Sequence, residues 1–283
     1  MDTSQPSERR GRAVLSERVR TVLGLNPTSS TGVGTNTYLV GRNAPILIDA
    51  GAGVPAYAEA LRAALAEWGL GGIDRVLVTH GHSDHVGGLG QVSALAPGAP
   101  VMRGAPPGSV PSDGTTPVRD GDVIRAGGCT LTALHTPGHA ADHLCFYLHE
   151  ERALFSGDLI AGEGTVVIPL QGGDLADYLR SLERVLALDL GRIYPGHGPV
   201  IPDGPAKVRE YLDHRRMRDR QILDALRAGI TDVARIVERI YVGVPHELHR
   251  LARQSVLQHL RKLEREGIVA AADPEAEGFV LRT

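Results

Sequence analysis

A six-residue motif, His80-Gly81-His82-Ser83-Asp84-His85, constrains the fold of this 283-residue chain more than any other feature. It begins at the end of the β-type run VLVTH and places four metal-binding side chains within six positions, in a chain with only 12 histidines. A loop that leaves a strand can point alternate residues to one side. His80 and His82 can therefore share one ion, while Asp84 and His85 turn towards a second. Imidazole and carboxylate ligands suit zinc and would also accept Mn or Fe.

Two ions need further ligands from elsewhere in the chain, because six consecutive residues cannot close both without severe backbone strain. Three candidates stand at strand-to-loop junctions: His139 in HTPGH, Asp158 in FSGD and His197 in YPGHG. The whole set is five His and two Asp, which would give each ion three ligands of its own if Asp158 bridges them. We therefore expect two ions per chain, zinc being the first choice.

Short β-type runs alternate with helical patterns up to residue 206, which predicts an α/β domain over residues 13–206. Apolar residues recur at helical spacing from Tyr57 and again from Leu179. Cys129 and Cys145 lie in apolar surroundings without metal-type spacing, so we expect two core residues and no disulfide. The expected strands cover residues 37–40, 45–49, 75–79, 129–135, 144–148 and 153–155.

The C-terminal part has a different pattern. Three apolar stripes at helical spacing begin at Ile222, Val233 and Val256, and the last ends at Gly267 as a C-cap. Two short apolar runs, IVAA and FVLR, follow. Three helices and a hairpin predict a winged helix-turn-helix domain over residues 207–283. The Gly- and Pro-rich stretch GHGPVIPDGP before it is expected to connect the two domains.

The first twelve residues, MDTSQPSERRGR, hold no apolar stretch that could serve as a secretory signal. We expect residues 1–12 to form a disordered tail. The chain has no run of about 18 apolar residues that could cross a membrane. With no disulfide framework expected, a cytoplasmic location without membrane contact follows as the expectation.

Charge is divided unevenly between the two parts. Residues 207–283 hold 15 Lys and Arg against 12 Asp and Glu, a net charge of +3, whereas the rest of the chain has a net charge of −6. The cations that could meet nucleic acid phosphates on the last helix are Arg253, Arg261, Lys262 and Arg265. A net charge of +3 is weak for such a role. We therefore favour the alternative, in which the domain forms a wall of the active-site cleft or a dimer surface, and a homodimer remains open.

The motifs THGHSDH, HTPGH, SGD and PGHG, in this order, resemble the metal motifs of the metallo-β-lactamase superfamily over residues 20–200. With Asn36-Thr37-Tyr38, Leu47-Ile48-Asp49 and the winged helix, the whole chain is similar to the lactamase-like-protein-2 group, which includes endoribonucleases and fungal carrier-protein thioesterases. The resemblance implies an αβ/βα sandwich. It also implies one ion at His80, His82 and His139, a second at Asp84, His85 and His197, and Asp158 between them.

A hydrolytic mechanism follows from two such ions, with a metal-bridging hydroxide as the nucleophile. Asp84 is the carboxylate expected to accept or steer the proton of the water, and Asp49 to orient a ligand histidine from behind. His143 is expected to be a hydrogen-bonded structural residue, with substrate contact as the alternative. Ser83 and Ser156 lack a nucleophile-elbow motif and are expected only to shape their loops. Other histidines, His214 and His259 among them, have no paired spacing and are expected on the surface or in packing.

Departures from other branches narrow the implied function. True metallo-β-lactamases usually carry Cys at the position of Asp158 and lack a ligand at that of His85. Flavin-linked di-iron relatives carry Glu at the position of His82. About 39 residues separate Asp158 from His197, too few for the large insertion of nucleases that process mRNA ends.

Four functions stay open at this point. The sequence leans to cleavage of phosphodiesters in single-stranded RNA, with hydrolysis of thioesters or esters, of the acyl-carrier or acyl-CoA type, close behind. The ligand set disfavours a β-lactamase. Because all seven ligands are present, it also disfavours a metal-sensing DNA-binding regulator. In each hydrolytic case the partner is the substrate, a small molecule or single-stranded RNA.

Overall fold

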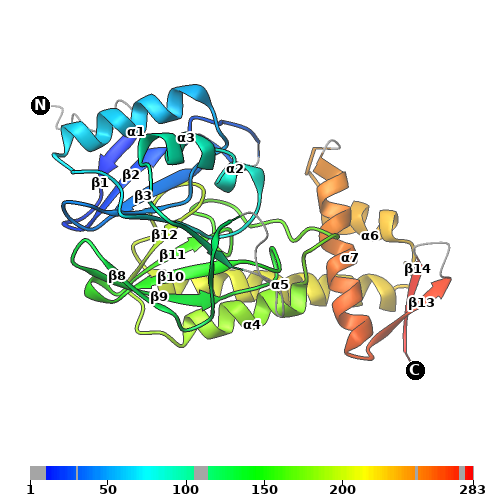
Figure 1. Ribbon diagram of the computed structural model, residues 1–283. Helices are drawn as coiled ribbons and strands as arrows, with labels where there is room; N and C mark the ends of the chain where they lie inside the picture. The colour runs from blue at the N-terminus through cyan, green and yellow to red at the C-terminus, as the bar shows by residue number, and fades with distance from the viewer. Residues whose placement is uncertain (1–10, 30, 105–113, 246–247, 274–277, 283) are drawn as a thin grey trace, which may run out of the picture. The chain divides into compact units, whose positions relative to one another are not determined.

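The computed structural model of the chain describes residues 11–29, 31–104, 114–245, 248–273 and 278–282 (Figure 1). These residues belong to two compact units. The first comprises Met1–Thr136, Asp142–Gly164 and Asp189–Pro205. The second comprises Pro137–Ala141, Thr165–Leu188 and Ala206–Thr283.

The first unit contains a seven-stranded sheet. Its strands follow the chain, in the order β1 (Arg12–Val14), β2 (Val19–Leu23), β3 (Asn36–Val40), β4 (Ile46–Ile48), β5 (Arg75–Val78), β6 (Val101–Gly104) and β7 (Thr116–Val118). The pairs from β1 to β4 are antiparallel and those from β4 to β7 are parallel. Parallel neighbours end at the same edge, so the loops after β4 and β5, which carry Asp49 and His80, start side by side.

A five-stranded sheet makes the second layer of this unit. Its order is β12 (Arg192–Pro195), β11 (Ala153–Gly157), β10 (Leu144–Leu148), β9 (Cys129–His135) and β8 (Val123–Ala126). Only β11 and β12 are parallel. Their shared direction brings Asp158, directly after β11, and His197, two residues after β12, to one edge of the sheet.

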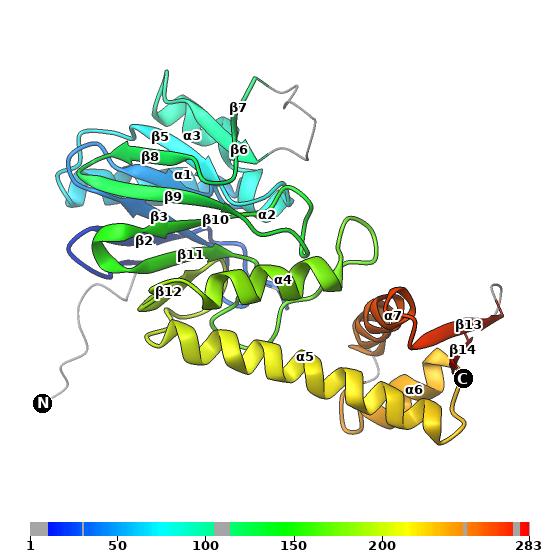
Figure 2. The ribbon, with the colours of Figure 1, turned by 90° about the horizontal axis from the view of Figure 1, so that it is seen from below.

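Alternation along the strands builds two apolar layers in the first unit. Tyr38 and Val40 face the five-stranded sheet and pack in one core with Phe146 and Phe155. Leu39, between them in sequence, faces the other way into a second core. That second core covers the outer face of the seven-stranded sheet with helices α1 (Pro55–Glu67) and α3 (Leu89–Leu95), as Figures 1 and 2 show. Cys129 and Cys145 are free and buried, which confirms the prediction of two core cysteines.

The second unit is mainly helical. Its helices are α4 (Leu175–Leu186), α5 (Gly204–Arg227), α6 (Val233–Ile240) and α7 (His249–Arg265), and its hairpin pairs β13 (Val269–Asp273) with β14 (Gly278–Leu281). The three predicted stripes meet in one core that includes Ile222, Ile236 and Leu260, and the hairpin adds Val269 and Phe279. The predicted three-helix and hairpin arrangement is therefore observed. Gly267 follows α7 with φ +75°, as its expected capping role requires.

Two expectations about segment boundaries need correction. Arg12 begins β1, so the tail does not reach residue 12; its residues 1–10 lie outside the described ones. The stretch 196–205 is not a free connector, since Ile201 bridges to Ile193 and α5 already begins at Gly204. Pro205 fits the first turn of a helix as well as it fits a loop, because its missing N–H has no partner there in either case.

Several strands gave no signal in the sequence. Strands β1, β2, β6, β7, β8 and β12 were not expected. They are three to five residues long, and edge strands such as β1 and β8 alternate too briefly to stand out.

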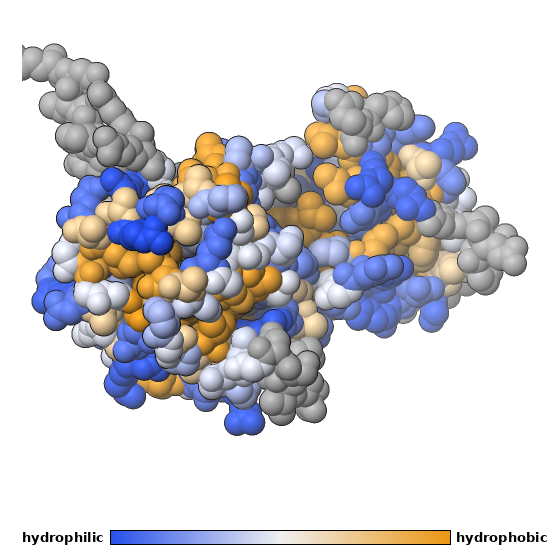
Figure 3. Space-filling view, turned by 45° about the horizontal axis from the view of Figure 1, so that its top comes forward, coloured by the Kyte–Doolittle hydropathy of each residue, from blue (hydrophilic) through white to orange (hydrophobic). Residues whose placement is uncertain are grey.

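No helix among the described residues is long and apolar enough to span a membrane. Figure 3 shows that the visible face of each unit mixes hydrophilic and hydrophobic residues. Such mixing is ordinary for a folded domain, since apolar atoms contribute more than half of a typical protein surface.

Candidate metal centre

Six of the seven predicted metal ligands meet within the first unit. His80, His82 and Asp158 form one group whose ligand atoms all lie within 4.8 Å of one another. Asp84, His85 and His197 form a second group within the same limit. The His-rich loop supplies four of the six, and its short helix α2 (Ser83–Val86) turns Asp84 and His85 away from His80 and His82.

The second group has the spacing of a metal shell. His197 Nε2 lies 3.2 Å from Asp84 Oδ2 and 3.3 Å from Asp158 Oδ1. His85 Nε2 lies 3.5 Å and 3.4 Å from the same two oxygens. Ligand atoms about 2.1 Å from one ion at tetrahedral angles lie about 3.4 Å apart, so these four atoms fit a zinc-like ion. Asp158 therefore reaches both groups.

Buried His85 shows most directly that this set is built for a cation. Its side chain is 0% exposed, and its Nε2 has no hydrogen-bond partner among the described residues. Asp49 Oδ2 lies 2.7 Å from His85 Nδ1. A carboxylate only accepts, so Nδ1 carries a proton, and Nε2 faces the site, where it can bind a metal ion or a second proton. A buried lone pair without a donor is costly unless a metal or a proton occupies it.

The electrostatics of the group favour added positive charge. Burial disfavours the imidazolium of His197, but hydrogen bonds with Asp158 and Asp84 outweigh it and raise the pKa of His197 to about 9. Burial would also raise the pKa of Asp158, yet the positive charge of His85 and the contact with His197 hold that pKa well below its usual range. The carboxylates are thus ionised and attract positive charge. Binding of a divalent ion requires ligands in this state.

Asp49 lies behind His85, one of the candidate ligands. It is 2% exposed, and its carboxylate also accepts from Thr79 N and Thr79 Oγ1, both at 2.8 Å. Thr79 Oγ1 lies 3.1 Å from His80 Nδ1, so this hydroxyl connects Asp49 to the first ligand group. Thr79 was not among the residues expected from the sequence. Its position immediately before His80, at the end of a strand, was the available signal.

His143 acts through Asp158 in this structure. Its ring is fully buried, with Nδ1 2.9 Å from Thr136 Oγ1 and Nε2 accepting from the backbone N–H of Asp158 at 3.1 Å. Both ring nitrogens are therefore used to hold the loop after β11. This arrangement supports the structural reading of His143 over substrate contact, and Thr136 is a second positioning residue that was not expected from the sequence.

Two glycines let the strand ends approach this closely. Gly157 has φ +47°, and a Cβ there would lie 2.8 Å from His143 Nε2. A Cβ at Gly196 would lie 2.7 Å from Asp158 Oδ1 and 3.0 Å from His85 Cε1. The glycines of SGD and PGHG are therefore required by the space around the ligands.

Asn36 fixes the loop that carries His197. Its side-chain amide donates to Pro195 O at 3.0 Å and to Gly198 O at 2.8 Å, and its backbone N–H donates to Gly196 O. Asn36 thus holds the backbone on both sides of His197.

His139, the seventh predicted ligand, stands in the segment Pro137–Ala141, which packs with the second unit. Within that unit its Nδ1 lies 2.9 Å from Val167 O, so Nε2 is the atom it can offer to a metal. Its place at the first ion stays a proposal.

The four predicted phosphate contacts are largely engaged inside the second unit. Lys262 Nζ lies 2.9 Å from Asp219 Oδ2, and Arg265 Nη1 lies 2.7 Å from Asp174 Oδ2. Arg261 donates to Leu170 O at 3.2 Å. Arg253, the fourth, is also not free of contacts. Cations paired in this way have less charge to offer to a nucleic acid.

Comparison with known proteins gives two matching domain families. Residues 30–197 match the Metallo-beta-lactamase superfamily, and residues 233–276 match the Beta-lactamase associated winged helix domain. The "Beta-lactamase-like protein 2 homolog" of Caenorhabditis elegans is 39% identical over 94% of this chain and 90% of that protein. The "Atrochrysone carboxyl ACP thioesterase" of Aspergillus chevalieri is 38% identical over 87% of this chain and 80% of that protein.

A solved structure agrees with these matches. The metallo-beta-lactamase family protein TTHA1429 from Thermus thermophilus has a TM-score of 0.78 and 25% identity, over 95% of this chain and all of that one. The mixed α/β fold and the C-terminal winged helix expected from the sequence are both confirmed.

Proposed function

The chain belongs to the metallo-beta-lactamase superfamily and is a metal-dependent hydrolase, and from this premise we propose that it uses two metal ions, most simply zinc, to hydrolyse acyl thioesters. The observation that carries the two-ion proposal is the position of Asp158 Oδ1, which lies 3.3 Å from His197 Nε2 and 3.4 Å from His85 Nε2 while Asp158 also belongs to the group of His80 and His82. One carboxylate thus joins two ligand groups.

Two divalent cations held by these residues would activate a water molecule as the nucleophile and polarise the scissile carbonyl. The reaction then consumes a thioester and water and releases a carboxylic acid and a thiol. The chain's own residues position and receive protons. Asp84 is the proposed proton acceptor, because its side chain is 25% exposed whereas that of Asp158 is 12% exposed.

In the proposed mechanism, residues behind the ligands hold the ligand side chains in position. Asp49 fixes the tautomer of His85, and Thr79 links Asp49 to His80. His143 holds the backbone of Asp158. Val167 O lies 2.9 Å from His139 Nδ1, which would leave Nε2 of His139 to act as a ligand of the first ion.

Two observations support a thioester over RNA as the substrate. The cations expected to grip phosphates, Lys262 and Arg265 above all, pair with carboxylates of their own unit. A relative of similar length and 38% identity is named as an acyl carrier protein thioesterase. Cleavage of single-stranded RNA, to which the sequence leaned, is the competing proposal, since the same ions would serve it.

The test compares both substrates on the zinc-loaded full chain. Thiol release from an octanoyl thioester is followed with a thiol reagent, and a labelled single-stranded RNA is followed by gel. The two cysteines are buried and free, so they should add little background. Thioester hydrolysis without RNA cleavage is expected, and the reverse result would replace the proposed substrate.

Two variants in the site give the matched comparison. Asp158→Asn should lower thioester hydrolysis by at least about a hundredfold, since it removes the shared ligand. Ser83→Ala, in the same His-rich loop, should stay within about threefold of the wild type because hydroxide, and not serine, is the nucleophile. Equal damage by both variants at unchanged metal content would replace this mechanism by a serine nucleophile.

A further inference from the structure

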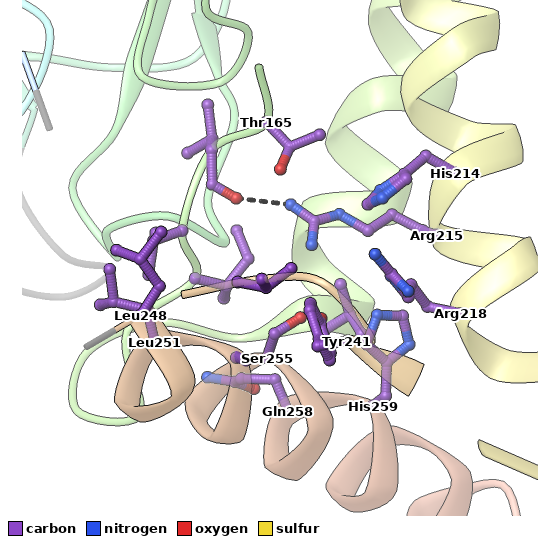
Figure 4. A pocket seen from close by; sticks show the side chains of 16 residues that line it. Thr165, His214, Arg215, Arg218, Tyr241, Leu248, Leu251, Ser255, Gln258 and His259 are labelled. Carbon is purple, nitrogen blue, oxygen red and sulfur yellow. Dashed lines mark hydrogen bonds between the residues drawn. The ribbon is translucent and has the colours of Figure 1, made fainter. Parts of the chain in front are cut away.

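A cavity of about 260 Å³ lies within the second unit, and none of the candidate metal ligands lines it. One wall is the segment from Thr165 to Ile168, another is the face of α5, and α7 closes the third side (Figure 4). Volumes of about 300 Å³ and above hold drug-sized ligands, so this space suits a smaller molecule.

The α5 wall carries positive charge that has no carboxylate partner among the residues described. Arg215 is 4% exposed; it donates to Val166 O at 2.6 Å, and its Nε has no hydrogen-bond partner. Arg218, one turn on, stacks on Tyr241 at 4.3 Å and donates to Gln221, and its Nε is also unpaired. Burying guanidinium groups without an opposite charge is costly.

Two histidines that line the same cavity also have an unpaired nitrogen each, buried in the cavity wall. His214 Nδ1 and His259 Nε2 are buried without a hydrogen-bond partner. The carboxylate of Asp219 does not offset the arginines, because it accepts from His259 Nδ1 at 2.7 Å and from Lys262 Nζ at 2.9 Å. Burial and the charges of Arg215 and Arg218 lower the pKa of His214 to about 4, as expected beside uncompensated cations.

The remaining walls are apolar. Their side chains include Val166, Ile168, Leu175, Leu248 and Leu251. Leu248 and Leu251 are 40% and 38% exposed, so large apolar side chains stand in contact with solvent beside the cavity. A ligand that fits must therefore join an anionic group to a short apolar body.

We propose that this cavity is a binding site for a small amphipathic anion, with a carboxylate or phosphate group at Arg215 and Arg218 and an apolar chain against Leu248 and Leu251. Thioester hydrolysis would release a carboxylic acid, so a ligand with a carboxylate head group could be the enzyme's own product. This link to the product rests on the proposed function, whereas the binding site itself does not.

The cavity wall also contacts a proposed metal ligand. Val167 lines the cavity, and its carbonyl oxygen lies 2.9 Å from His139 Nδ1. Its neighbour Val166 is held by Arg215. An anion that draws Arg215 towards itself would shift the carbonyl that orients His139. Occupancy of the site is therefore expected to change thioester turnover as well.

The experiment titrates three eight-carbon probes into the zinc-loaded full chain by calorimetry: octanoate, octyl phosphate and octanol. Binding of one anion per chain is expected. Octanol should bind at least about tenfold more weakly, because it lacks the charge that strengthens a hydrogen bond to an arginine, and a charged hydrogen bond contributes about tenfold or more in affinity. Tighter binding of octanoate assigns a carboxylate ligand, and tighter binding of octyl phosphate a phosphate ligand. The titration is repeated after chelation, and anion binding should persist.

Matched variants on one helix locate the site. Arg218→Met should weaken anion binding at least about tenfold, and Arg218→Lys should retain most of it, because the charge remains. Arg216→Met is the control, since Arg216 is exposed, pairs with Asp213 and does not line the cavity. It should stay within about twofold of the wild type. Circular dichroism checks that each variant is folded.

Four results would overturn the proposal. The first two are no binding of either anion at about 10 mM, a concentration at which even weak sites fill, and an affinity for octanol equal to that for the anions. The other two are loss of anion binding after chelation, and an equal loss of anion affinity in Arg216→Met and Arg218→Met. Failure here with thioester hydrolysis intact would refute the anion site alone. Anion binding by a chain that hydrolyses no thioester would refute the proposed substrate alone.

Discussion

Replacing Asp49 by asparagine tests whether the metal centre depends on residues behind the ligands. Asp49 accepts three hydrogen bonds of 2.7 to 2.8 Å, from His85 Nδ1, Thr79 N and Thr79 Oγ1. Asparagine keeps the shape and tolerates the φ of +60° at this position. Its amide oxygen can still accept from Thr79 N, but its NH₂ group faces the Nδ1–H donor of His85, and only the Thr79 hydroxyl can turn to accept from it.

The consequence of this mismatch can be given a magnitude. His85 loses the acceptor that fixes its tautomer, and loss of such a partner typically lowers metal affinity about 10- to 100-fold. Leaving buried donors unpaired should also lower the free energy of unfolding by about 1–3 kcal/mol. The weakening should affect the ion of Asp84, His85 and His197 most, because Asp49 contacts only His85 of that group.

Competition between the protein and a chromophoric zinc chelator measures both ions, and urea unfolding of the chelated protein measures stability. Asp74→Asn serves as the control, since Asp74 is partly exposed, pairs with Arg75 and lies outside both ligand groups. It should leave both affinities unchanged. Two zinc ions bound by Asp49→Asn with wild-type affinity would refute the reasoning.

Three further predictions concern space, protonation and charge. Gly196→Ala should weaken zinc binding at least about tenfold, because its Cβ would lie 2.7 Å from Asp158 Oδ1. In the control Gly90→Ala, the added Cβ meets nothing within 4 Å, so zinc binding should not change. Equal zinc affinities of the two variants would contradict this prediction. His214 has a folded pKa of about 4 against an ordinary 6.5, so the unfolded chain takes up the proton first and stability falls as pH drops through this window. In chelated protein, the free energy of unfolding measured with urea should fall between about pH 7.5 and about pH 5. After allowance for solvent screening, His214→Gln should make this fall smaller by about 1 kcal/mol. A fall of the same size in the variant would contradict the prediction. Arg261→Ala combined with Lys262→Ala should lower stability by about 1–2 kcal/mol, because Lys262 bridges Asp219 and Glu266, and leave RNA affinity unchanged; lower affinity with a flatter salt slope would show that this helix grips RNA.

The candidate metal ligands could be brought together from the sequence because short local motifs carry them. Four of them lie in one six-residue loop, and Asp158 and His197 each follow a short strand and a glycine. The strand ends then meet for a topological reason, since parallel neighbours such as β11 and β12 finish at the same edge.

Residues that hold the ligands left a fainter trace. Thr79 and Thr136 are single threonines with no partner at a fixed spacing, and only the folded sheets show which histidine each one contacts. The sequence could suggest that Asp49 acts from behind the ligands, but not that it reaches His85.

The cavity of the second unit was outside the reach of sequence patterns. Arg215 and His259 are 44 positions apart on different helices, and His214 and His259 were expected only in packing or on the surface. Helical periodicity identified the apolar faces correctly, but it cannot tell a charge that faces solvent from one that lines a cavity.

Zinc-dependent activity is the most direct test of the central claim, that two metal ions joined by Asp158 hydrolyse a thioester. Chelated full-length chain is titrated with zinc while thiol release from an octanoyl thioester is measured at each step. We predict that activity rises to a plateau at two zinc equivalents per chain and that Asp158→Asn does not recover it. Full activity at one equivalent, or activity that survives chelation, would contradict the claim.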